Sequence, residues 1–124
     1  MNIVIRTVCV LSLVIGALTA SAEEQPQHFE GKDSKTLQEA LENLEQYSER
    51  MEELMEGDDL SHQEIGEVHR LTYTLEKAMI RIREEAEIMA EDLERVHLGS
   101  EGGDAEQVRR YGEKFIERAE ILAD

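Results

Sequence analysis

Apolar residues recur at alternating gaps of three and four along one long stretch of the chain, residues 61–97. The positions that keep this spacing are Ile65, Val68, Thr72, Leu75, Met79, Ile82, Ala86, Met89, Leu93 and Val96. The stretch holds no proline, and its single glycine, Gly66, lies near its start. Such spacing places side chains on one stripe of an α-helix, as in a coiled coil. It predicts a helix of about 55 Å, at 1.5 Å per residue, around which the rest of the chain is organised.

Both ends of this helix carry sequence signals. Ser61 and Glu64 have the spacing of a capping box, and Leu60 with Ile65 forms the matching hydrophobic staple. At the other end, residues 98–103 contain three glycines, which favour a connector over a continued helix. We therefore expect the helix to end at His97.

A shorter amphipathic helix is predicted on each side of the long one. The first covers residues 34–56, with Asp33 or Ser34 as its cap and Gly57 as its stop. Its apolar face consists of Leu37, Ala40, Leu41, Leu44, Tyr47, Met51, Leu54 and Met55. The second covers residues 104–122, and its apolar face consists of Val108, Tyr111, Phe115, Ala119 and Leu122. The short connectors indicate that both pack antiparallel to the long helix.

The predicted fold class is all-α, an antiparallel three-helix bundle or hairpin built on the long central helix. Each flanking helix covers about half of that helix, and the two overlap for only about 10 Å around Met79–Ala86. A closed bundle would need more overlap between the flanking helices, or a bend in the long helix. An unbent helix leaves its apolar seam partly bare, and a homodimer would cover it.

The first 22 residues are typical of a cleavable signal peptide. Arg6 precedes an apolar run, and Ala20-Ser21-Ala22 predicts cleavage after Ala22. The apolar run is shorter than the roughly 20 residues of a spanning helix, which disfavours an uncleaved anchor. Residues 23–33 are then an extended lead-in, and residues 34–122 form one helical domain.

The processed chain is strongly acidic and contains no cysteine. Arg6 is the only charge before residue 23, so 29 acids and 12 bases remain, a net charge of −17. This field repels phosphate backbones and anionic membrane surfaces, and we expect neither as a partner. Cys9 leaves with the signal, so packing rather than disulfides must hold the exported protein together.

No catalytic site is indicated by the sequence. A metal site has four weak candidates: His28, His69, His97 and Glu94. Glu94 and His97 form a single Glu-x-x-His, whereas di-iron bundles need that motif twice. Noncovalent haem would require Met51 or Met55 to face His69, although core filling is the usual role of such methionines. We therefore predict no cofactor.

Three stretches carry a resemblance to a known family. They are His28-Phe29-Glu30-Gly31-Lys32, His69-Arg70-Leu71-Thr72-Tyr73-Thr74-Leu75-Glu76-Lys77-Ala78 and Val96-His97-Leu98-Gly99-Ser100. With them the chain, over residues 27–122, resembles a family of small exported proteobacterial proteins classed only as a domain of unknown function. The resemblance implies a periplasmic location and no known site residue. We expect a non-enzymatic protein that acts by protein–protein association, with a metal- or haem-binding bundle and a periplasmic stress chaperone as alternatives.

Overall fold

The structure is a computed structural model, and it describes residues 29–57 and 59–123. This part of the chain forms three helices: α1 (Leu37–Met55), α2 (His62–Gly102) and α3 (Ala105–Ala123). The predicted all-α class with one long central helix is confirmed. None of the described helices is long and apolar enough to cross a membrane. The predicted signal segment, residues 1–22, lies outside the described residues.

Helix α1 begins two to three residues later than the sequence predicts. Its cap is Thr36, whose hydroxyl accepts a hydrogen bond from the Glu39 amide at 3.1 Å. The expected cap, Ser34, is used elsewhere: its hydroxyl accepts from Asn43 and its carbonyl from Arg81. A tertiary contact has therefore taken the group that a local signal would have assigned to the helix end.

Helix α2 is unbroken for 41 residues, about 60 Å, and does not end at His97. The predicted capping box is present at its start, with Ser61 and Glu64 bonded in both directions. The helix continues through Gly99 and ends at Gly103, which is left-handed with φ of 71°. Gly99 is buried against Gln107 and Val108 of α3, so its glycine serves a close helix contact rather than a helix stop.

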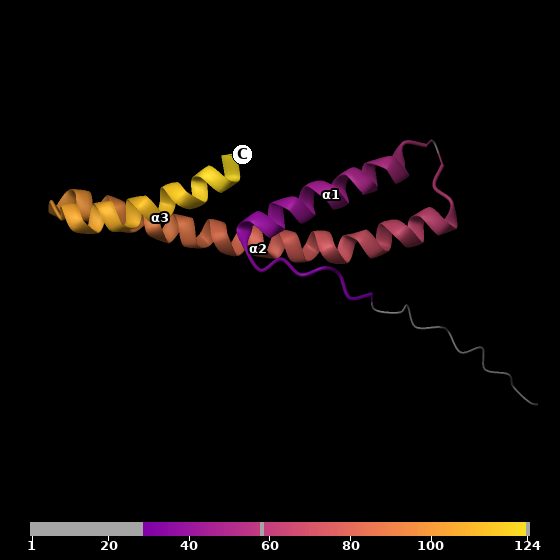
Figure 1. Ribbon diagram of the computed structural model, residues 1–124, viewed down its shortest axis with the longest axis horizontal. Coiled ribbons are helices and arrows are strands. Elements are labelled where there is room, and N and C mark those ends of the chain that lie inside the picture. The colour runs from indigo at the N-terminus through magenta and orange to yellow at the C-terminus, as the bar shows by residue number, and fades with distance from the viewer. Residues whose placement is uncertain (1–28, 58, 124) are drawn as a thin grey trace, which may run out of the picture.

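The two shorter helices lie one after the other along α2 and form two antiparallel helical hairpins that share it (Figure 1). α1 packs on the first half of α2 and α3 on the second half, and both contact it extensively. Direct contact between α1 and α3 is slight, because they meet near the middle of α2 instead of overlapping. The longer α2 moves the start of α3 outward, which removes the overlap expected around Met79–Ala86.

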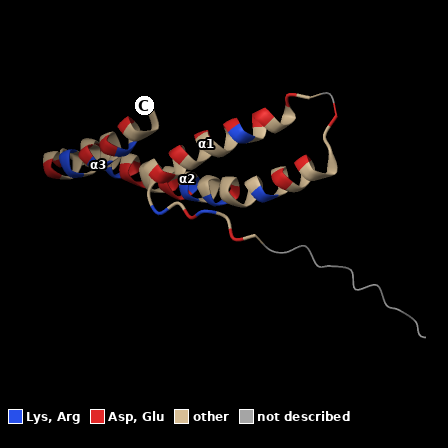
Figure 2. Ribbon diagram, turned by 45° about the vertical axis from the view of Figure 1, so that its right-hand side comes forward, with Lys and Arg blue, Asp and Glu red and all other residues tan. Residues whose placement is uncertain are grey.

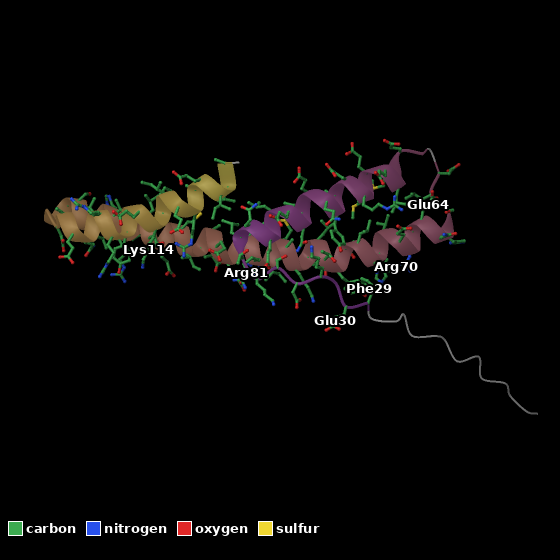
Figure 3. All side chains as sticks on the ribbon, in the orientation of Figure 1. Phe29, Glu30, Glu64, Arg70, Arg81 and Lys114 are labelled. Atoms are coloured by element: carbon green, nitrogen blue, oxygen red, sulfur yellow. The ribbon has the colours of Figure 1, made fainter. Side chains whose placement is uncertain are left out.

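An extended segment, residues 29–36, precedes α1 and runs beside α2; we call it the N-terminal strap. Figure 3 shows Phe29 and Glu30 at its outer end and Arg81 of α2 near the end where it turns into α1. The lead-in was predicted over residues 23–33, and its part before residue 29 lies outside the described residues. Phe29 keeps 49% of its surface exposed and so contributes little to the core.

The buried line of α2 is made of small and polar residues and lies one position before the predicted seam. Thr74, Ala78 and Asp92 are buried, whereas the seam residues that follow them, Leu75, Met79 and Leu93, are not. No seam position is fully buried. Small side chains let the helices approach closely, and the larger apolar residues are left at the flank of the contact. The seam is therefore partly bare, as expected where the two covering helices do not overlap.

Candidate protein interaction surface

The first structural element of this surface is the junction between the strap and α2. Gly31 lies so close to α2 that an added Cβ would stand 2.6 Å from the Tyr73 carbonyl carbon and 2.7 Å from the Thr74 nitrogen. The Lys32 amide donates to the Thr74 hydroxyl at 3.0 Å, and the Lys77 ammonium donates to the Gly31 carbonyl at 2.8 Å. Only glycine permits this approach, because the obstructing atoms belong to a helix backbone and cannot move aside.

A buried amide of α1 completes the junction. Asn43 is 1% exposed, and its Nδ2 donates to the Ser34 hydroxyl at 2.9 Å and to the Asp33 carbonyl at 3.3 Å. Its Oδ1 is buried without a hydrogen-bond partner in the structure. Asn43 thus fixes where α1 leaves the strap, at the cost of one buried acceptor.

Two carboxyl groups of the first hairpin have pKa values below their usual range. A hydrogen bond from Lys77 to Asp33, at 2.6 Å, and the charge of that lysine lower the pKa of the Asp33 carboxyl. Hydrogen bonds from the Ser61 hydroxyl and amide lower the pKa of Glu64. The Asp33 side chain is largely exposed and Glu64 is half-buried at the helix end, so solvent screens the stabilisation that each provides.

Ion pairs hold the second hairpin; we call Arg118, Glu85 and Asp92 the Arg118 cluster. The Arg118 guanidinium contacts the Glu85 carboxylate at 3.0 Å and the Asp92 carboxylate at 3.1 Å. The side chains of Glu85 and Asp92 are only 16% and 10% exposed. Arg81 lies 3.9 Å from Glu85 and also donates to the Ser34 carbonyl. A chain of polar contacts therefore runs from the strap through the middle of α2 to α3.

The predicted histidine candidates are not brought together. His69 and His97 are 28 residues apart on one unbroken helix, a separation of about 42 Å. His69 Nε2 lies 3.2 Å from the Tyr73 hydroxyl, and His97 Nε2 lies 3.5 Å from Glu101. Glu94 is exposed on the same helix as His97, and His28 falls outside the described residues.

No group of three or more His, Cys, Asp or Glu side chains in residues 29–57 and 59–123 could hold a metal ion. The haem alternative required Met51 or Met55 to face His69. Met51 is half-buried, Met55 is 56% exposed, and His69 makes an edge-on contact with Tyr73, with ring centroids 5.2 Å apart.

One half of the predicted seam remains exposed along α2. We call its positions, which repeat every seven residues, the exposed stripe: Ile65, Thr72, Met79, Ala86 and Leu93. Ile65, Met79 and Leu93 keep 51%, 52% and 49% of their surface exposed, Ala86 is exposed, and Thr72 is half-buried. The alternate seam positions, Val68, Leu75, Ile82, Met89 and Val96, are all half-buried. α1 and α3 therefore cover one row of the seam and leave the other open.

Acidic residues recur along α1 in Figure 2, whereas α3 carries a balanced set. α1 contains six acids and one base, and α3 contains four acids and four bases. The two hairpins thus differ in charge as well as in packing. A partner of the exposed stripe would meet an acidic flank at one end and a mixed flank at the other.

Sequence reasoning found the stripe but missed the residues that position it. No sequence motif distinguishes Gly31, Asn43 and Thr74, and none of them belongs to a predicted apolar face. The first two stretches that carry the family resemblance do contain Gly31, Thr74 and Lys77, which the fold brings into contact. The third contains Gly99, which lies against α3.

The whole chain, residues 1–124, matches a protein family described as a family of unknown function, DUF6746. The chain belongs to this family. No curated protein and no solved structure matches it. Membership in DUF6746 assigns no activity. The features that bear on function are therefore the exposed stripe and the contacts that fix α1 and α3 on the neighbouring face of α2.

Proposed function

We propose that this protein is a non-enzymatic, exported helical protein that acts by association with a protein partner through the exposed stripe. The observation that carries the proposal is the seven-residue repeat on α2 from Ile65 to Leu93, in which every position except the half-buried Thr72 is apolar and exposed. Apolar side chains in such a row gain free energy when a partner removes them from water.

The arrangement of the covers supports a built surface rather than an accident of packing. α1 and α3 are both docked on the neighbouring face of α2, by the strap junction in one case and the Arg118 cluster in the other. A regular helix backbone then presents the stripe over about 42 Å. A rigid apolar row of that length suits an extended partner helix.

Export is supported by the pattern of residues 1–22, with an apolar run followed by Ala20-Ser21-Ala22. The family resemblance implies the bacterial periplasm as the compartment. Intact-mass measurement of protein recovered from the periplasm tests this part: a chain that begins at Glu23 is expected. A cytoplasmic chain that keeps residues 1–22 would contradict it.

Association through the stripe is tested by photo-crosslinking in the native cell. A photoreactive residue at Met79 should give a discrete protein adduct. The matched position is Glu91, which is exposed on the same helix about 120° further around it. Glu91 should give none. Equal labelling at both positions, or none at either, would sink the proposal, and adducts with many unrelated proteins would favour a chaperone instead.

A further inference from the structure

The period of the exposed stripe matches the period of another copy of itself. A seven-residue repeat corresponds to 3.5 residues per turn, which two helices share when they pair as a coiled coil. We infer that the partner is a second copy of this chain, and that the two α2 helices pair antiparallel through their stripes with a two-fold axis at Met79. This inference rests on the proposed function and names its partner.

The charges beside the stripe fix the register. With Met79 opposite Met79 of the second copy, Thr72 faces Ala86 and Ile65 faces Leu93. Glu76 and Arg83 lie beside the stripe, on the flank of α2 that α1 and α3 leave open. In this register Glu76 of each copy faces Arg83 of the other, so the pair occurs twice. The competing register, with Met79 opposite Ala86, would set Arg83 against Arg83. In the single chain Arg83 has only a loose contact, 3.9 Å from the equally exposed Glu87, so it is available for a better partner.

The distribution of charge along α2 selects the antiparallel orientation. With Met79 on the axis, residues 82–96, with six acids and two bases, face residues 62–76, with three acids and one base. Antiparallel pairing therefore lays the more acidic half of one helix against the less acidic half of the other. Parallel pairing would lay the two acidic halves together and raise their mutual repulsion.

The same two-fold axis gives each short helix a neighbour that it lacks within one chain. α1 and α3 lie on one side of α2, so the axis puts α1 of one copy beside α3 of the other. Six acids and one base on α1 then face a helix with four acids and four bases, which has no net charge, instead of a second acidic α1. Within one chain the two helices barely touch. Each half-length hairpin thereby becomes half of a four-helix bundle, and the bundle is continuous along α2.

Two further apolar side chains lie on the flanks that would meet. On α1, Asn43 and Arg50 mark the flank near the strap, where they contact Ser34 and Glu67. Met55 is 56% exposed and lies 120–140° further around α1, on the opposite flank, at about 100° per residue. On α3, Ile116 is 55% exposed and lies about 160° from Arg118 by the same geometry. Each flank therefore offers one large exposed apolar side chain on the side of the stripe.

The contact area is sufficient for a stable dimer. The stripe is about 42 Å long, and the face formed by α2 with its neighbour is about two helices, or roughly 20 Å, wide. Pairing would remove roughly 840 Å² from each copy, about 1,700 Å² in total, within the usual range of about 1,200–2,000 Å² for specific interfaces.

The first test is the mass of the purified chain by sedimentation equilibrium at micromolar concentration and physiological salt. The dimer mass is expected. Met79→Glu places two carboxylates at the two-fold axis and should weaken association at least about 100-fold. The matched control, Ile80→Glu, adds the same charge at the next residue, which is 47% exposed but on another face, and should leave the dimer intact. Circular dichroism checks that both variants keep their helices.

The register is tested by charge exchange. Arg83→Glu should weaken the dimer about tenfold, because it faces Glu76 of the second copy. Glu76→Arg should do the same, and the double exchange should restore the original affinity to within about threefold. No recovery in the double variant would contradict the register.

The orientation is tested by oxidation of single cysteines in a Cys9→Ser background. Met79→Cys should form a disulfide-linked dimer, because the two positions meet at the axis. Ala86→Cys should not, because the two copies of residue 86 lie about 21 Å apart when antiparallel. A parallel dimer would crosslink at both positions and would overturn the orientation.

A monomer mass at 100 micromolar would overturn the homodimer altogether. It would leave the proposed function standing if Met79 still crosslinks to a different protein in the cell. Failure of the Met79 crosslink together with a monomer mass would contradict both the homodimer and the proposed function. Because the mass and the crosslink are measured independently, the two proposals can fail separately.

Discussion

The two hairpins that share α2 are held by different physical means. In the first, α1 buries Leu37 and Ala40 completely, Asn43 bonds the strap, and Gly31 lies against the helix backbone. In the second, α3 has no fully buried residue, and its strongest contacts are the ion pairs of the Arg118 cluster. The same helix thus supports one junction made by close packing and hydrogen bonds and another made by charge.

This difference implies that the two hairpins respond to different perturbations. Close backbone contacts with buried hydrogen bonds are insensitive to salt and intolerant of added volume. Half-exposed ion pairs tolerate volume changes but weaken as ionic strength rises. α3 should therefore open more readily than α1, and each hairpin can be weakened without the other.

The largest effect is expected from Gly31→Ala. The new methyl group meets backbone atoms at 2.6–2.8 Å, so the strap must leave α2 and lose its bonds to Thr74 and Lys77. We expect a loss of about 2–3 kcal/mol in the free energy of unfolding, measured in urea.

The matched control is Gly66→Ala on α2. An added Cβ there has no neighbour within 4 Å, and alanine favours a helix by up to about 1 kcal/mol over glycine. A Gly31→Ala protein as stable as the Gly66→Ala protein would show that the strap is not a close-packed junction.

The second hairpin is tested by Arg118→Met, which leaves the Asp92 carboxylate almost buried without its partner. We expect a loss of about 1–2 kcal/mol, smaller than for Gly31 because the cluster keeps some access to water. Hydrogen exchange should locate the loss in α3.

Salt sharpens this result. In 1 M sodium chloride the difference between the Arg118→Met protein and the unaltered chain should shrink, whereas the Gly31→Ala difference should not. Arg95→Met, an exposed change on the same hairpin, should alter stability by less than about 0.5 kcal/mol. Equal salt responses at Gly31 and Arg118 would remove the contrast between the hairpins.

A smaller effect is expected at the start of α2. Ser61→Ala removes the hydroxyl that accepts from the Glu64 amide and should cost about 1 kcal/mol by thermal or urea unfolding. Ser48→Ala, at an exposed position inside α1, should be neutral or slightly stabilising, because alanine is the better helix former.

The smallest effect concerns pH and the exposed ion pair of the strap. The pKa of Asp33 is lower in the folded chain than in the unfolded one, because Lys77 stabilises its carboxylate. This contribution is present above the unfolded pKa and disappears as the pH falls through the folded pKa. Asp33→Asn should therefore make the acid-induced fall in the melting temperature slightly shallower, and an identical acid profile would show that the ion pair adds nothing.

Much of the fold could be predicted from the sequence because its signals are local. The three helices, the Ser61 capping box and the antiparallel order follow from spacing, caps and short connectors. The predicted end of α2, His97, was wrong by five residues. Glycine usually favours a helix end, and only the position of α3 shows that Gly99 instead allows a close helix contact. The cap of α1 was wrong for a similar reason, since Ser34 is bonded to Asn43 and Arg81.

The candidate surface was predictable only in part. The seam gave the period of the exposed stripe, but not which of its two rows α1 and α3 would cover. That choice depends on small residues one position away, Thr74 and Ala78, and on Gly31, which lies 43 residues from Thr74. No local pattern marks a glycine that is needed because another segment passes within van der Waals distance.

The helical periods, the acidic charge and the seven-residue repeat along α2 can be deduced without a structure, because each depends on residue types at fixed separations. The placement of α1 and α3 around α2, and hence the exposure of the row from Ile65 to Leu93, depends on contacts between segments that are distant in the chain. Helix–helix distance depends on the side chains between the helices, and small residues, such as the fully buried Ala40 of α1 and Ala78 of α2, allow a closer approach than large apolar ones. The apolar row was therefore left for another partner.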